Sequence, residues 1–159
     1  MESLLLALYK KTAPGADNFD KLISFGTRSL YTHSEIIHIR KGGIVQLSVS
    51  PRDTAFRGKE HLVDEDTWDY FKIDSLDEAK ALSKAYALLG VKYDWLALSG
   101  FITRIKVNSN TRMFCSESST EIIQAGGVKL FNHSKPYMVS PAMLGDNPLC
   151  IKVNIGDYL

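Results

Sequence analysis

The segment that most constrains the fold is THSEIIHIRKGGIVQLSVSP, residues 32–51, in which β-branched and apolar residues flank Gly42 and Gly43. Consecutive glycines tolerate the positive φ angles that a tight hairpin turn requires. The segment therefore predicts a β-hairpin with strands near 32–40 and 44–49, ended by Pro51. Further strands are predicted over residues 4–9, 68–73 and 149–155.

The best helix pattern is SLDEAKALSKAYALLG, residues 75–90. Ser75 and Glu78 have the spacing of a capping box, and Gly90 supplies a stop signal. The apolar face expected for this helix consists of Leu82, Ala85, Tyr86 and Leu89. Other helices are predicted over residues 17–28 and 93–102, and from Cys115 to the glycine pair at 126 and 127.

The order of these elements indicates the fold class. Strands come first, helices occupy the middle, and a short strand closes the chain, which is typical of an α+β protein with a largely antiparallel sheet. The chain of 159 residues is long enough for one ordinary domain and shows no linker or repeat. We therefore interpret residues 1–159 as a single domain.

The composition is that of a soluble globular protein, with 45% hydrophobic residues, 23% charged residues and a formal net charge of +1. Lysine and arginine never gather into a block, which argues against nucleic acid or a membrane surface as a partner. The opening segment MESLLLALYKK lacks a basic start, and its apolar run is too short for a signal peptide or a membrane span. We therefore expect no transmembrane segment and a cytoplasmic protein.

The chain has two cysteines, Cys115 and Cys150. They could form one disulfide, but without a secretory signal we expect both thiols to stay reduced. Cys150 lies in the apolar stretch LCIKV and is expected in the core. Cys115, in RMFCSESSTEII, begins a predicted helix, where unpaired N–H groups and the helix dipole favour a thiolate and an oxyanion. The alternative is that Cys115 is only a small packed residue.

A cysteine nucleophile needs a base, and the histidines available are His33, His38, His61 and His133. His33 is the best candidate, because strand alternation places it about 7 Å from Glu35 on the same face. Glu35 could then orient the imidazole, and Gln46 or Ser48 across the hairpin is an equally physical choice. His61 and His133 lie in polar segments and are expected to be exposed.

A metal site is the rival use of cysteine and histidine. The segment HSEIIH lacks the helical H-E-x-x-H spacing, and the chain has no C-x-x-C pair. We therefore expect no metal site and no other cofactor.

Three segments in order, YTHSEIIHI, VKYDWLALSGF and RMFCSESSTEII, span most of residues 31–125. With them the chain resembles the circularly permuted branch of the NlpC/P60 superfamily, papain-like thiol hydrolases in which the histidine precedes the cysteine. The length is similar to that of small bacterial and phage-encoded members. The resemblance implies a papain-like α+β domain in which a small antiparallel sheet packs against the nucleophile helix.

The resemblance also implies roles for individual residues. Cys115 would be the nucleophile and His33 the general base. Glu35 matches an acidic position after the histidine in similar phage sequences, whereas other relatives place the orienting polar group on the next strand, where this chain has Gln46 and Ser48. Tyr93 matches an aromatic position that lines the active site.

The functional hypothesis is a cysteine-dependent hydrolase that cleaves an amide, peptide or ester through an acyl-enzyme thioester, with cell-wall peptide as one possible substrate. Acyl transfer would use the same groups. The alternative from another class is a non-catalytic binding or assembly protein, such as a phage structural or host-interaction factor, favoured by the lack of a carboxylate on the second hairpin strand. The substrate and the oligomeric state stay open, as does a phage origin with action in the host cell.

Residues 50–66 carry Arg52, Arg57 and Lys59. These cations could form a rim that recognises a substrate carboxylate. An ordinary solvated loop is an equally good interpretation.

Overall fold

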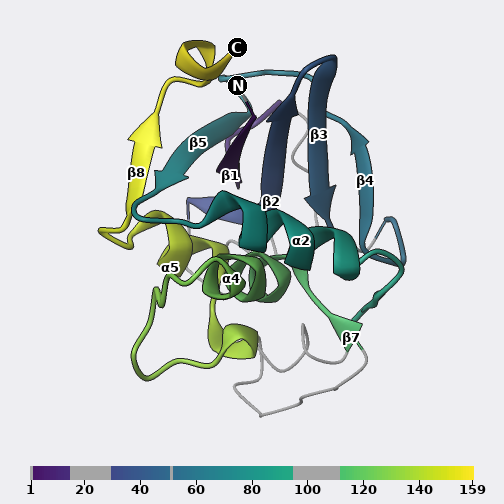
Figure 1. Ribbon diagram of the computed structural model, residues 1–159, viewed down its shortest axis with the longest axis vertical. Helices are drawn as coiled ribbons and strands as arrows, with labels where there is room; N and C mark the ends of the chain where they lie inside the picture. The colour runs from purple at the N-terminus through teal and green to yellow at the C-terminus, as the bar shows by residue number, and fades with distance from the viewer. Residues whose placement is uncertain (1, 15–29, 51, 95–111) are drawn as a thin grey trace.

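Figure 1 shows the computed structural model, which describes residues 2–14, 30–50, 52–94 and 112–159. Its centre is a six-stranded sheet in the order β4-β3-β2-β1-β5-β8, with every neighbouring pair antiparallel. The strands are β1 Ser3–Lys10, β2 Tyr31–Arg40, β3 Gly43–Ser48, β4 Arg57–Glu60, β5 Trp68–Ile73 and β8 Cys150–Val153. Two short strands, β6 Lys92–Tyr93 and β7 Arg112–Met113, pair in parallel.

The described helices are α2 Glu78–Ala87, α4 Cys115–Ala125 and α5 Pro141–Gly145, with 3-10 turns η1 Pro136–Met138 and η2 Ile155–Tyr158. In Figure 1, α2 crosses in front of the lower part of the sheet, and α4 lies directly below α2 and contacts it. In the part of the chain that the structure describes, no helix combines the length and the apolar character that crossing a membrane requires.

The core lies on both faces of β1, because every residue from 4 to 8 is buried. Leu4, Leu6 and Leu8 face the helices and pack with apolar residues of α2 and α4. Leu5 and Ala7 face the other side, in a smaller cluster that includes residues of β2, β5 and η2. This follows from the alternation of side chains along a strand, which gives a central strand two apolar faces.

The predicted hairpin is confirmed within one residue at its outer ends. Lys41 and Gly42 connect β2 to β3, which begins at Gly43, one residue earlier than expected. Gly42 and Gly43 have φ angles of +101° and +143°. The strands predicted over residues 4–9 and 68–73 correspond to β1 and β5, and the strand near 149–155 is the shorter β8. The helices predicted over residues 17–28 and 93–102 lie largely or wholly outside the described residues.

The expected papain-like α+β domain, with a small antiparallel sheet against the nucleophile helix, is wrong. The described residues form mainly a six-stranded antiparallel sheet with few helices. The sheet is larger than expected because β1 pairs with both β2 and β5, and because β4 adds an edge strand. The β4 sequence, RGKE, has no alternating apolar pattern, so backbone pairing with β3 rather than periodicity holds it there.

The predicted cap of α2 is also wrong. Asp77, not Ser75, is the N-cap, and its side chain accepts a hydrogen bond of 3.1 Å from the Lys80 N–H. Ser75 has a φ angle of +59° in the turn before the helix. The buried face is also rotated from the prediction: Ala81, Ala85 and Leu88 are buried, whereas Tyr86 and Leu89 are exposed.

Candidate active site

Cys115 is the first residue of α4, as the sequence predicts. The N-cap residue Phe114 is extended, so the chain turns sharply into the helix at the cysteine. The side chain of Cys115 is buried and forms no disulfide. Because Cys115 is the first helical residue, its sulfur lies near the unpaired N–H groups and the positive dipole end of this eleven-residue helix.

The sheet opens beside this cysteine. Pairing between β2 and β3 ends at Ile36 and Leu47, while β2 continues along β1 as far as Tyr31. The strand β3 turns toward β4 instead, with Ser48 opposite Arg57. The β2–β3 ladder therefore does not extend over residues 31 to 35 of β2, and Ser34 in this stretch contacts the start of α4.

Ser34 lies in this stretch of β2 and contacts the thiol directly. Its backbone N–H and its hydroxyl both form hydrogen bonds with Cys115. The hydroxyl also lies 3.0 Å from the hydroxyl of Ser119, one turn further along α4. The sequence pattern predicts no role for Ser34, because in a strand it alternates away from the face that carries His33.

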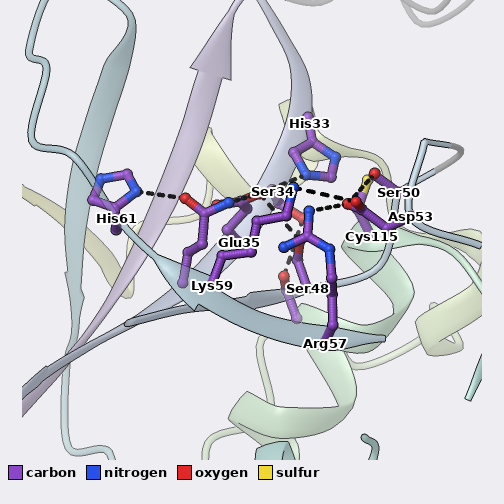
Figure 2. Close-up of polar contacts among 12 residues, drawn as sticks. His33, Ser34, Glu35, Ser48, Ser50, Asp53, Arg57, Lys59, His61 and Cys115 are labelled. Atoms are coloured by element: carbon purple, nitrogen blue, oxygen red, sulfur yellow. Dashed lines mark hydrogen bonds and ion pairs between the residues drawn. The ribbon is translucent and has the colours of Figure 1, made fainter. Parts of the chain in front are cut away.

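His33 forms a hydrogen bond with Cys115, and its Nε2 lies 3.1 Å from Glu35 Oε1. Each ring nitrogen has one in-plane site for a hydrogen bond, so Nδ1 is the atom left for the thiol. Figure 2 shows the three side chains, with the contact between His33 and Glu35 drawn as a dashed line. The imidazole therefore lies between the sulfur and a carboxylate.

Glu35 is buried, and its Oε1 accepts three hydrogen bonds. The donors are His33 Nε2 at 3.1 Å, Ser48 Oγ at 3.1 Å and Gln46 Nε2 at 3.3 Å. The three residues that the sequence offered as alternative partners of the imidazole thus lie together. Glu35 contacts the histidine, while Gln46 and Ser48 contact Glu35.

The pKa shifts of Cys115 and His33 both favour an ion pair between them. Burial raises the pKa of Cys115, but the charge and hydrogen bond of His33, followed by the hydrogen bonds from Ser34, lower it below its ordinary value. Burial lowers the pKa of His33, but the thiolate of Cys115, followed by Glu35, raises it above its ordinary value. The favoured state is a thiolate beside an imidazolium.

Tyr93 lies in β6, which the Asp94 N–H and the Met113 carbonyl join to β7, just before α4. Its phenol is buried, and its pKa is raised by that burial and then by the negative charges of Cys115 and Asp94. The hydroxyl therefore keeps its proton near the sulfur.

His61 is buried, with an exposed fraction of 4%, although its polar segment predicted exposure. Its Nδ1 lies 2.9 Å from Gln46 Oε1, and its Nε2 lies 2.8 Å from the Tyr70 hydroxyl. One pattern in the sequence does predict that His61 lies near Gln46. Arg57, Lys59 and His61 alternate along the chain, which places all three on the face that carries Gln46.

The two remaining histidines lie outside this network. His38 is on the other face of β2, with its Nδ1 3.2 Å from the Tyr86 hydroxyl. His133 is exposed, as expected. Cys150 is in the core, also as expected, and burial raises its pKa to about 12.

Two of the three cations considered for a substrate-binding rim, Arg57 and Lys59, are paired with Asp53. Arg57 forms an ion pair with Asp53, and Lys59 Nζ lies 3.2 Å from the same side chain. Burial raises the pKa of Asp53, but hydrogen bonds from Arg57, Ser50 and Lys59 lower it to about 2. Arg52 is exposed.

Within residues 2–14, 30–50, 52–94 and 112–159, no group of three or more histidine, cysteine, aspartate or glutamate side chains is arranged to hold a metal ion. Cys115 and Glu35 bond to different nitrogens of His33, so these three side chains do not converge on one point.

Comparisons with known proteins add information on the fold. No protein-family model matches the chain, and no curated protein matches it. Among solved structures, the chain is similar to the crystal structure of the metalloprotein yiiX from Escherichia coli O157:H7, a DUF1105 protein. The TM-score is 0.65 at 16% sequence identity, and the match covers 94% of each chain. The fold resembles that of a DUF1105 protein. This likeness replaces the papain-like architecture expected from the sequence.

Proposed function

We propose that the protein is a cysteine-dependent hydrolase of amide, peptide or ester substrates. The observation that carries this proposal is the position of the His33 imidazole, which bonds both to the Cys115 thiol at the start of α4 and to Glu35. A thiolate is the reactive form of cysteine, and a neighbouring imidazolium and a helix N-terminus both stabilise it.

In the first half-reaction, the Cys115 thiolate attacks the carbonyl carbon of the substrate and forms a C–S bond. The tetrahedral intermediate collapses as its bond to the leaving nitrogen or oxygen breaks. His33 donates its Nδ1 proton to that leaving group. The products are a free amine or alcohol and a thioester on Cys115.

In the second half-reaction, water attacks the thioester carbonyl. Neutral His33 accepts a proton from that water, the C–S bond breaks, and the thiolate beside an imidazolium is restored. The carboxylic acid product leaves the site and gives up its remaining proton to the solvent. Atoms and charge balance without any cofactor.

The oxyanion of each intermediate needs donors. The backbone N–H of Cys115 and the protonated hydroxyl of Tyr93 are the groups we assign to this role, because both lie at the sulfur end of the site. Glu35 orients the imidazole and stabilises its charged form, with Gln46 and Ser48 holding the carboxylate.

The name of the yiiX protein describes a metalloprotein. We do not extend that property to this chain, because the described cysteine, histidine and glutamate side chains of the site do not converge. The resemblance to permuted NlpC/P60 proteins, a cytoplasmic location and a phage origin stay predictions. The lack of a carboxylate on the second hairpin strand slightly favours the binding-protein alternative, and it carries less weight here because Glu35 on β2 contacts His33.

The test is to trap the acyl-enzyme. Protein incubated with p-nitrophenyl acetate should gain one acetyl group on Cys115, detected by intact mass and peptide mapping, and lose it again with time. His33→Ala should acylate far more slowly while keeping its fold, measured by circular dichroism. No acetyl group on Cys115 in the wild type, or equal acylation in the His33→Ala variant, would contradict the proposal.

If acetyl transfer to an added amine outcompetes hydrolysis, the acyltransferase variant of the same chemistry is favoured. Both outcomes use the same thioester, so the release product distinguishes them.

A further inference from the structure

A chain of hydrogen bonds leads away from the candidate site through a second histidine. Glu35 is bonded to Gln46, Gln46 to His61, and His61 to Tyr70. We propose that His61 is a positioning residue that fixes the Gln46 amide and, through it, the Glu35 carboxylate beside His33. This inference rests on the proposed hydrolase function, because it gives His61 a positioning role in the same site.

The donor and acceptor of each hydrogen bond in this series can be assigned by starting from Gln46. An ionised carboxylate can only accept hydrogen bonds, so the amide nitrogen of Gln46 faces Glu35 Oε1 at 3.3 Å. The amide oxygen then faces His61, with 2.9 Å between Oε1 and Nδ1. An oxygen of this kind also only accepts, and therefore Nδ1 of His61 must carry a hydrogen.

The other nitrogen of His61 is then an acceptor, provided that the ring is neutral. Burial lowers the pKa of His61, against the opposing effect of Glu35, so the neutral ring is favoured. Burial also raises the pKa of Tyr70 to about 12, so its hydroxyl keeps a proton to donate to Nε2 at 2.8 Å. The backbone N–H of Asp64 approaches the same hydroxyl oxygen at 3.5 Å.

Packing holds the ring plane of His61. Its ring lies edge to face with Trp68, at 5.7 Å between centroids, and with Tyr70 at 5.8 Å. His33 also lies edge to face with Trp68, at 6.3 Å. The two histidines therefore share one indole as a packing surface, and neither ring can rotate without disturbing it.

This arrangement predicts a dependence on pH. Glu35 from β2 faces His61, Tyr70 from β5 bonds to it, and Asp64 and Glu65 lie beyond Tyr70. Protonation of His61 would place a hydrogen on Nε2, opposite the Tyr70 hydroxyl hydrogen. That hydroxyl would have to rotate. The series in which Tyr70 donates to His61, His61 to Gln46 and Gln46 to Glu35 would then be broken at its first bond.

The test uses Tyr70→Phe, which removes only the hydroxyl that donates to Nε2 of His61. Tyr86→Phe is the matched control, because it removes the hydroxyl of the other histidine–tyrosine pair, 3.2 Å from His38. Two readouts are needed: the tautomer of His61 from ¹⁵N-edited NMR of imidazole nitrogens, and the rate of Cys115 alkylation by iodoacetamide from pH 5 to 9.

We expect His61 in the wild type to be neutral with its proton on Nδ1. Tyr70→Phe should keep the proton on Nδ1 but let Nε2 of His61 protonate at a higher pH, because the donor that favours the neutral ring is gone. It should slow alkylation at pH 6.5 about fivefold and shift the acid limb of the rate profile to higher pH. Tyr86→Phe should match the wild type in both readouts. A wild-type Nε2–H tautomer, or an unchanged alkylation profile in Tyr70→Phe, would overturn the inference.

A second pair of variants covers the case in which Tyr70→Phe fails to fold. His61→Gln retains an N–H donor for Gln46 and should keep most of the alkylation rate at pH 6.5, whereas His61→Leu should lose it. Equal rates in the two variants would overturn the inference. Slow alkylation of wild-type Cys115 itself would instead reject the proposed hydrolase, while NMR would still decide the tautomer of His61.

Discussion

His33 Nε2 lies 3.1 Å from Glu35 Oε1, although only Ser34 separates the two residues in β2. The intervening Ser34 points to the other face, where it bonds to Cys115 and Ser119. Three consecutive residues of one strand therefore supply an imidazole, a backbone N–H with a hydroxyl, and a carboxylate around a single thiol. This is possible because β3 separates from β2 at this point and leaves room for the start of α4.

Glu35→Gln should weaken the thiolate–imidazolium pair. The amide keeps the shape of the side chain but removes the negative charge beside His33, so the imidazolium loses a stabilising partner. We expect alkylation of Cys115 by iodoacetamide at pH 6.5 to slow at least tenfold. Glu2→Gln is the control, because Glu2 lies 3.9 Å from His38 in a histidine–glutamate contact outside the site. Equal slowing in both variants would argue against a specific role for Glu35.

The pH profile of Cys115 alkylation should differ from that of an ordinary thiol. The pKa of Cys115 is lowered and that of His33 is raised, so the ion pair exists at pH values between the two. The rate should therefore stay high below the ordinary thiol pKa of about 8.5 and fall only as pH drops through the lowered pKa of Cys115. Cys150, whose pKa is raised to about 12, is an internal control and should label slowly throughout this range.

Ser34→Ala should reduce the reactivity of Cys115 by a smaller factor. The variant removes one hydroxyl hydrogen bond to the sulfur and leaves the backbone N–H in place. We expect a rate about three- to tenfold lower at pH 6.5, corresponding to one hydrogen bond to a charged group. Ser119→Ala removes the partner of the same hydroxyl without touching the sulfur and should have the smaller effect. The reverse order would show that the contact is only structural.

Glu117→Gln should stabilise the protein at alkaline pH. Burial raises the pKa of Glu117 to about 7, helped by Glu121 and Asp94 and opposed by the hydrogen bond from the Phe114 N–H. Because the folded pKa exceeds the ordinary value of 4.5, this group stabilises the fold at low pH, and the contribution is lost as pH rises through about 7.

Glutamine keeps an acceptor for Phe114 and cannot ionise. The Tm of Glu117→Gln should therefore exceed that of the wild type by a few degrees at pH 8 and match it near pH 5. Glu121→Gln, which breaks an ion pair of 2.9 Å with Lys84, should give no such gain. An increase that is the same at both pH values would exclude ionisation as the cause.

Gly126→Ala should destabilise the contact between α4 and the start of α2. A Cβ at this position would lie 2.4 Å from Leu76 Cδ1 and 3.0 Å from the Asp77 carbonyl oxygen. We expect a loss of about 1–3 kcal/mol in the free energy of unfolding, measured by urea denaturation. Gly127→Ala meets nothing within 4 Å but forces alanine to a φ angle of +87°, so its loss should be about 1 kcal/mol. A larger loss for Gly127→Ala would contradict this ranking.

Several local features could be predicted because their causes are local. The glycine pair at 42 and 43 permits positive φ angles, and the hairpin forms there. Apolar runs predict β1 and β5, and the glycine pair at 126 and 127 predicts the end of the helix that begins at Cys115. The apolar surroundings of Cys150 predict its burial.

Other features depend on contacts between distant segments. β4 is a strand only because β3 offers it an edge, and His61 is buried only because Gln46 and Tyr70 satisfy both of its nitrogens. The contact of Ser34 with Cys115 requires the divergence of two strands and the approach of a helix more than eighty residues later in the chain.

The sequence by itself determined where the hairpin turns, where the Cys115 helix begins and which side chains have the chemistry to react, because backbone sterics and side-chain type are properties of short segments. The tertiary structure decided the size of the sheet, which was predicted wrongly, and the assembly of His33, Ser34 and Glu35 around the thiol. That assembly depends on which strands pair and where pairing stops. Backbone hydrogen bonds form between any two strands, so the sequence of one strand does not show which strand it will pair with.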